Sequence, residues 1–176
     1  MNYSYQIIDE LLSHYKSVIG IDFNRYRNHV SRIYSYCKLM DNDTKNDEKY
    51  AIAAVFHDIG IWTDQTFDYL NPSIEQAKKY LIATNKQDWI EEITLMINWH
   101  HKMSSYRNSD YKTIEIFRKA DWIDVSQGVL KFEVKSADIK FLNQQLPSLG
   151  FHAFLMKSTL KNLFKNPLNP LPMFKR

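Results

Sequence analysis

The chain has 176 residues, of which 44% are hydrophobic and 24% charged, and its formal net charge is +3. This length suits one ordinary domain, and the composition argues against a disordered chain. The basic residues are scattered and no apolar run approaches the ~20 residues of a membrane helix, so we expect neither a nucleic-acid polymer nor a membrane as a partner. The amino terminus lacks the pattern of a secretory signal, which predicts a cytoplasmic protein.

Apolar residues recur at helical spacing along most of the chain, and no segment alternates as a strand would. We therefore predict an all-α fold with a single domain over residues 1–165. In chain order, we expect helices at 3–18, 22–41, 48–59, from 71 onward, 87–103, 111–127 and 149–165. Residues 166–176 contain three prolines and cannot be helical. They are expected to form an extended strap on the body, or alternatively a partner-binding motif.

Several residues indicate where these helices begin and end. Asp22 is a suitable N-cap for the second helix, and Gly60 is the residue type that most readily closes the third. Asn71 would cap the fourth helix, with Pro72 as its first residue. The single cysteine, Cys37, excludes an internal disulfide, and its place on an apolar stripe favours burial over catalysis.

Polar residues occupy positions where the helical pattern calls for apolar ones. His29 lies on the buried edge of the second helix, three residues after Tyr26. His57 and Asp58 end the apolar segment 51–60, which leaves no room for a solvated face. A buried carboxylate in such a place needs a partner, because burying an isolated charge costs several kcal/mol or shifts the pKa until the group is neutral.

The inner stripe of the sixth helix likewise contains two carboxylates, Asp121 and Asp124. One divalent cation would account for these buried histidines and aspartates together, because imidazole nitrogens and carboxylate oxygens are suitable ligands for such ions. The alternative is that Asp58 and Asp121 pair with arginine or lysine across the core.

The order of these elements resembles the HD superfamily of metal-dependent phosphohydrolases. The family pattern is a helical histidine, a His-Asp pair and a distant aspartate, here His29, His57-Asp58 within the sequence HDIG, and Asp121. The resemblance spans residues 22–128. It implies an HD-type bundle of about six to seven helices around a central metal site, in which these four residues bind one divalent ion per chain (Mn, Co, Ni, Fe, Zn or Mg).

The chain departs from two-metal members of this family. Those members usually carry a further histidine early in the helix after the His-Asp pair, where residues 71–77 contain none. A second metal is therefore not expected. His100 and His101 fall where later histidines of the family line the site. We expect His100 to reach the pocket and His101 to face outward, although both could instead be histidines favoured by the end of a helix.

The resemblance implies phosphoester hydrolysis of a nucleotide or another small phosphorylated metabolite by a metal-activated water. The expected catalytic residues are Asp58 as a ligand, His100 as general acid and Asp124 to orient the water or a ligand. Candidate substrate contacts come from the basic and aromatic residues near the motifs, namely Lys102, Arg118, Lys119 and Trp62. Each also has an ordinary structural reading, as a solvated charge, an ion pair or a packed ring.

Other functions remain open at this stage. Some HD-fold proteins are hydratases, lyases or iron oxygenases that act on small molecules. A ligand sensor that keeps its metal only for folding is a further alternative. The sequence permits a monomer or a homodimer.

Overall fold

The computed structural model describes residues 3–108 and 110–166, and every regular element in these ranges is helical. The α-helices are α1 (Tyr3–Ile19), α2 (Phe23–Met40), α3 (Asp47–Phe56), α4 (Gly60–Thr63), α5 (Leu70–Ala83), α6 (Ile90–Trp99), α7 (Lys112–Val125), α8 (Ser136–Gln145) and α9 (Phe151–Lys165). They form one compact domain, so the prediction of an all-α, single-domain bundle is confirmed. The predicted tail comprises residues 166–176, and residues 167–176 lie outside the part of the chain that the structure describes.

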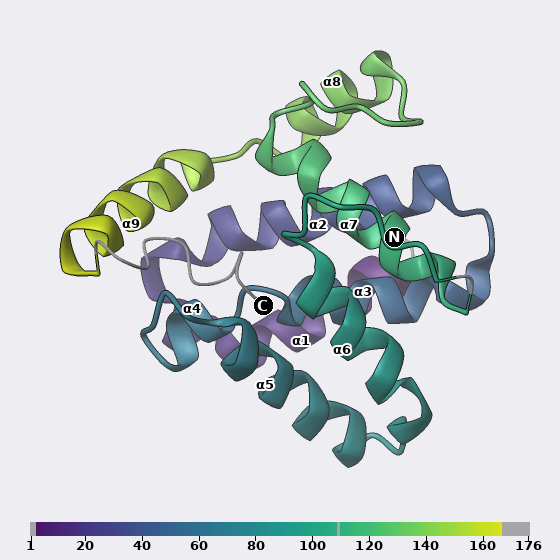
Figure 1. Cartoon of the computed structure of the whole chain (residues 1–176), viewed down its shortest axis with the longest axis horizontal. Helices are drawn as coiled ribbons and strands as arrows, with labels where there is room; N and C mark the ends of the chain where they lie inside the picture. The colour runs from purple at the N-terminus through teal and green to yellow at the C-terminus, as the bar shows by residue number, and fades with distance from the viewer. Residues whose placement is uncertain (1–2, 109, 167–176) are drawn as a thin grey trace.

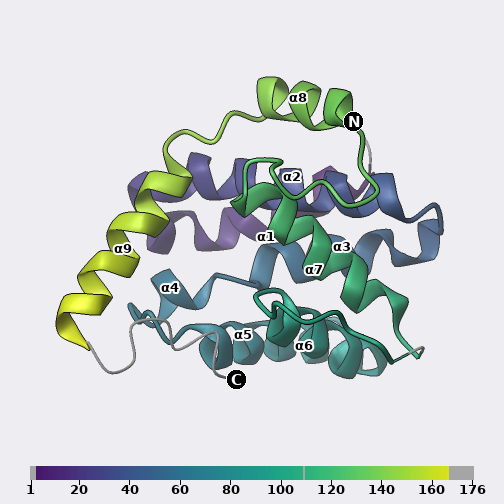
Figure 2. The same ribbon diagram turned by 45° about the horizontal axis from the view of Figure 1, so that its top comes forward.

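The helices form two packed groups with α3 between them (Figure 1). α2 packs against α1, α3 and α7, whereas α6 packs against α5 and α7. α3 contacts α1 and α2 on one side and α5 and α6 on the other. Figure 2 shows α8 above α2 and α9 extending from one end of the body. Within the described ranges, no helix combines the length and hydropathy needed to cross a bilayer.

The central helix α3 is surrounded by protein. Every residue from Tyr50 to Phe56 is buried. A helix that is hydrophobic all round belongs in the interior of a domain. Because α3 runs through the middle of the bundle, the two residues that follow it, His57 and Asp58, arrive at its centre.

The end of α3 differs from the prediction. The helix stops at Phe56, and Gly60 begins the short helix α4 instead of closing α3. The physical reason for a glycine here is close approach, since a Cβ at this position would lie 2.6 Å from the carbonyl oxygen of Tyr69 and 2.9 Å from Cβ of Pro72. Gly60 thus allows the turn after His57 and Asp58 to sit directly against the start of α5.

The two predicted N-caps have different outcomes: Asp22 is the N-cap residue of α2, whereas Asn71 does not cap α5. Asp22 makes no capping hydrogen bond, because its side chain pairs with Arg25 at 2.6 Å and accepts a hydrogen bond from Nε1 of Trp62 at 2.9 Å. α5 begins at Leu70, so Asn71 and Pro72 lie inside its first turn. Proline is tolerated there because the first backbone N–H groups of a helix have no partner within the helix.

The region between α7 and α9 contains a helix that was not predicted, α8. It buries only Ile139, so its sequence carries little helical periodicity. Its position depends on Gly128, which adopts φ +80° just after α7. A Cβ added to Gly128 would lie 2.8 Å from Cγ2 of Ile139, so only a glycine allows α8 to approach this closely.

The predicted end of α7 near Gly128 agrees with its last residue, Val125. Cys37 is fully buried, as predicted.

The loop after α2 is held by a buried carboxylate, Asp41. Its oxygens accept hydrogen bonds from Nδ2 of Asn46 and the hydroxyl of Tyr50, both at 2.8 Å, and from the backbone N–H of Asp43 at 3.1 Å. Burial by itself raises the pKa of Asp41, but these hydrogen bonds outweigh it and lower the pKa below its usual range. Asp41 therefore stabilises the fold as a carboxylate.

We expect Asp41→Asn to lower the free energy of unfolding by about 1–3 kcal/mol at pH 7. The NH2 group of asparagine would face groups that donate hydrogen bonds to Asp41, so at least one of these hydrogen bonds would be lost. A carboxyl group with a lowered pKa contributes stability above its unfolded value of about 3.9 and loses it as the pH falls through the folded value. In urea unfolding, the difference from the wild type should therefore shrink toward pH 3. The exposed Asp88→Asn serves as control, and a difference that persisted unchanged at low pH would contradict this role.

Candidate metal centre

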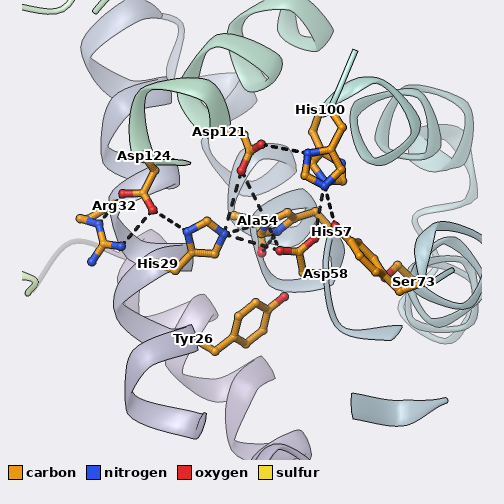
Figure 3. Close-up of polar contacts among 12 residues, drawn as sticks. Tyr26, His29, Arg32, Ala54, His57, Asp58, Ser73, His100, Asp121 and Asp124 are labelled. Atoms are coloured by element: carbon orange, nitrogen blue, oxygen red, sulfur yellow. Dashed lines mark hydrogen bonds and ion pairs between the residues drawn. The ribbon is translucent and has the colours of Figure 1, made fainter. Parts of the chain in front are cut away.

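Four polar side chains from three parts of the chain converge at the centre of the bundle (Figure 3). His29 projects from α2, His57 and Asp58 follow α3 directly, and Asp121 projects from α7. Their exposed fractions are 0–2%, so each is removed from bulk water. These are the four residues predicted as metal ligands, and the fold brings all of them together.

The distances within this cluster suit a single ion. The Nε2 atoms of His29 and His57 are 3.0 Å apart, and Nε2 of His57 is 3.3 Å from Oδ2 of Asp58. Oδ1 of Asp121 lies 4.0 Å from Nε2 of His29 and 3.9 Å from Nε2 of His57. Two atoms that are each about 2.1 Å from one ion are about 3.0 Å apart at a right angle and about 4.2 Å apart across it. His29, His57 and Asp58 therefore have the spacing of a group that could hold a metal ion, and Asp121 borders this group.

Hydrogen bonds on the outer side of each ring orient the two histidines. Nδ1 of His57 donates to the carbonyl oxygen of Ala54 at 2.7 Å, and Nδ1 of His29 lies 2.6 Å from Oδ2 of Asp124. Because a neutral imidazole carries one proton, both Nε2 atoms then direct lone pairs toward the centre. Two lone pairs 3.0 Å apart need a positive charge between them, supplied by a cation or a proton.

The groups around His29 also favour a positive charge at its ring. Burial by itself lowers the pKa of His29, but the hydrogen bonds and negative charges of Asp124 and Asp58 outweigh it and raise the pKa to about 9. A metal ion at this position would therefore replace a proton at neutral pH.

Two carboxylate oxygens in the cluster lack a hydrogen-bond partner. They are Oδ1 of Asp58 and Oδ1 of Asp121, both buried. A buried polar atom without a partner costs about 1–3 kcal/mol, and more when it is charged. Desolvation raises the pKa of Asp121, as expected for a carboxylate in this setting. A divalent cation beside the two Nε2 atoms would satisfy Oδ1 of Asp121 and bind Oδ2 of Asp58, so the residues present fit the predicted ion.

His100 and His101 both lie beside the cluster, which corrects the prediction that His101 faces outward. Nδ1 of His100 donates to the carbonyl oxygen of Ile97 at 2.6 Å, and its Nε2 lies 3.5 Å from Oδ1 of Asp58. Nδ1 of His101 is 3.6 Å from Oδ2 of Asp121. The reason is that α6 ends at Trp99, so the two rings are not held on opposite sides of a helix.

Asp124 contacts the predicted ligand His29 and does not face the centre. Its two oxygens are engaged by the guanidinium of Arg32 and by Nδ1 of His29. It therefore lies behind His29, on the side away from the other ligands (Figure 3), where it cannot orient a water molecule at the centre. This outer position became visible only in the tertiary structure, because Arg32 is 92 residues away in sequence.

Three of the four predicted substrate contacts are engaged elsewhere. The guanidinium of Arg118 bonds both oxygens of Glu115, at 2.8 and 2.6 Å. Lys119 pairs with Glu133 at 2.5 Å. Trp62 donates to Asp22, and its ring packs 4.5 Å from that of Tyr26, which is the structural alternative for this residue. These side chains are therefore committed to the fold. Lys102, which follows His101 directly, is half-buried.

The structure adds residues that were not predicted. The hydroxyl of Tyr69 lies 2.5 Å from Nε2 of His101, and Oγ of Ser73 accepts a hydrogen bond from the backbone N–H of Gly60 at 3.0 Å. Arg32 is 1% exposed. A signal for Arg32 was present, because it stands between His29 and Ile33 on the same buried edge of α2.

No protein-family model matches the chain, and neither a curated protein nor a solved structure is significantly similar to it. The assignment of a function therefore depends on the motifs and on the geometry described above.

Proposed function

We propose that the protein is a metal-dependent phosphohydrolase of the HD type, with one divalent ion per chain held by His29, His57, Asp58 and Asp121. The observation that carries the proposal is the convergence of two inward Nε2 atoms, Oδ2 of Asp58 and the partnerless Oδ1 of Asp121, at separations between 3.0 and 4.0 Å where they are measured. The alternative in which these aspartates pair with arginine or lysine finds no support among the described residues, where the ionic neighbours of Asp58 and Asp121 are histidines.

When bound, a divalent ion would supply a Lewis acid for a phosphate oxygen and a water activated at neutral pH. The chain itself would supply the proton for the leaving group. His100 is the candidate, because its Nε2 is buried beside Asp58 without a hydrogen-bond partner. Burial by itself lowers the pKa of His100, but the close contact with Asp58 and the negative charges of Asp58 and Asp121 raise it overall. The substrate class remains a nucleotide or another small phosphorylated metabolite.

The test combines elemental analysis of the purified protein with phosphate-release assays. We would screen a panel of nucleotides and small phosphate esters in the presence of Mn²⁺, Co²⁺, Ni²⁺ and Mg²⁺, since the donor types suit several ions. About one metal ion per chain with release from a narrow set of substrates is the expected result. One ion per chain without hydrolysis of any ester would favour the hydratase, lyase or sensor alternatives.

Metal removal should lower the stability of the protein. An ion that binds only the folded state stabilises it by about 2.7 kcal/mol at a concentration of 100 Kd. For a chain of this length, that corresponds to a rise in Tm of roughly 5–10 °C when Mn²⁺ or Zn²⁺ is added to metal-stripped protein. Thermal unfolding monitored by circular dichroism would measure the shift. An equal shift in a variant lacking both histidines, His29→Ala with His57→Ala, would argue against this site.

A second candidate function is an oxygenase with two irons. One observation favours it: Asp58 also belongs to a second donor group, with His100 and His101. Because His101 faces inward, the missing histidine at residues 71–77 is a weaker argument against a second ion than the sequence alone suggested. Two irons per chain with oxygen consumption would favour this function over the phosphohydrolase.

A further inference from the structure

We infer that Arg32 and Asp124 are positioning residues of the metal centre, which hold His29 in the tautomer and orientation that metal binding requires. This inference depends on the proposed metal-dependent function. Neither residue touches the centre itself. Both act through His29.

The contacts form a chain from Arg32 through Asp124 to His29 (Figure 3). The guanidinium of Arg32 bonds both oxygens of Asp124, with Nη2 2.9 Å from Oδ2. Oδ2 of Asp124 lies 2.6 Å from Nδ1 of His29, and Nε2 of the same ring faces His57 at 3.0 Å. Because a carboxylate only accepts hydrogen bonds, Asp124 requires the proton of His29 on Nδ1 and leaves Nε2 free for the ion.

Burial protects these hydrogen bonds from water. Arg32, Asp124 and His29 are at most 2% exposed, so water does not compete for their hydrogen bonds. The positive charge of Arg32 balances the carboxylate of Asp124, so the pair adds no net charge beside the ion.

The outer end of this chain is anchored by the segment that leads into α9. Nη1 of Arg32 donates to the carbonyl oxygen of Leu146 at 2.7 Å. The ring of Phe151 stacks on that of His29, with centroids 4.1 Å apart, and Nε2 of His152 lies 2.9 Å from the carbonyl oxygen of Asp124. The guanidinium of Arg32 is therefore held between Asp124 and Leu146. The ring of His29 is fixed by Asp124 at its edge and by Phe151 on its face.

A purely structural ion pair between α2 and α7 would predict a different outcome on mutation. Such a pair would affect the stability of the metal-free protein without changing how the ion is bound. A positioning pair changes the affinity for the ion and the symmetry of its ligand field. Loss of outer hydrogen bonds of this kind typically weakens metal binding 10–100-fold.

The experiment measures Co²⁺ binding to the full-length, metal-stripped protein by its visible absorption spectrum. We expect Asp124→Asn to weaken Co²⁺ binding about 10–100-fold and to shift the absorption bands. The matched control is Glu92→Gln. Glu92 is also a buried acid, 5% exposed, but it pairs with Lys49 at 2.6 Å and Thr113 at 2.5 Å, away from the centre. This control should bind Co²⁺ like the wild type.

A second measurement uses the wild-type protein, so it does not depend on whether Asp124→Asn folds. Nitrogen-15 NMR of histidine in the Zn²⁺-loaded wild type reports which ring nitrogen carries the proton, and His29→Gln assigns the signal. We expect the proton of His29 on Nδ1. An unchanged Co²⁺ affinity and spectrum in Asp124→Asn would overturn the inference alone. A proton on Nε2 would overturn the inference and also remove His29 from the proposed ligand set. Failure of the wild type to bind Co²⁺ or Zn²⁺ would overturn the proposed function together with it.

Discussion

Asp58→Ala and Asp121→Ala are each expected to abolish metal retention and phosphate release together. A methyl group cannot ligate an ion, and each substitution removes one of only two carboxylates in the proposed ligand set. Because changes to outer residues already weaken binding 10–100-fold, we expect the loss of a direct ligand to exceed about 100-fold. Elemental analysis after purification and the affinity for added Mn²⁺ would measure the effect.

Loss of the negative charge of Asp121 should not unfold the protein. Oδ1 of Asp121 is buried without a hydrogen-bond partner, so the carboxylate costs free energy when no ion is bound. The metal-stripped Asp121→Asn protein is therefore expected to be at least as stable as the metal-stripped wild type, as measured by urea unfolding. Asp64→Ala, an exposed acid in the segment after Asp58, should leave metal content unchanged. Full metal content in Asp58→Ala or Asp121→Ala would show that the ligand set is wrong.

Gly60→Ala is expected to destabilise the fold and to weaken metal binding. The added Cβ would lie 2.6 Å from the carbonyl oxygen of Tyr69 and 3.0 Å from the backbone nitrogen of Ser73. Backbone atoms cannot turn aside as a side chain can, so α4 and the start of α5 must separate, and overpacking of this kind costs about 1–3 kcal/mol. Asp58 lies two residues before Gly60, so the same movement would displace a proposed ligand.

Gly20→Ala is the comparison for this prediction. Gly20 adopts φ +61° and has no atom within 4 Å of a built Cβ. It should therefore lose only the ~1 kcal/mol cost of a left-handed backbone, with no change in metal affinity. Thermal unfolding and Mn²⁺ titration of both variants would separate the two causes. Equal metal affinity in Gly60→Ala and the wild type would contradict the link between this turn and the centre.

Much of the candidate site was predictable because it violates a local pattern. His57 and Asp58 end an apolar segment, and Asp121 stands on the inner stripe of a helix, so each was conspicuous without knowledge of its neighbours. The same reasoning left two roles open for Asp124, to orient the water or a ligand, because an inward direction does not say whether a side chain lies in front of a histidine or behind it. It misjudged His101 because the end of α6 was placed too late.

The sequence by itself determined the helical class and the single domain, and it marked polar residues at apolar positions. These follow from periodicity, which is a property of short stretches of chain, whereas the choice of four candidate ligands came from the resemblance to the HD superfamily. Only the tertiary structure decided which groups stand around the ligands. Arg32 and Asp124 are 92 residues apart, and Tyr69 and His101 are 32 residues apart. Contacts of this kind depend on how whole helices pack, which no local pattern encodes.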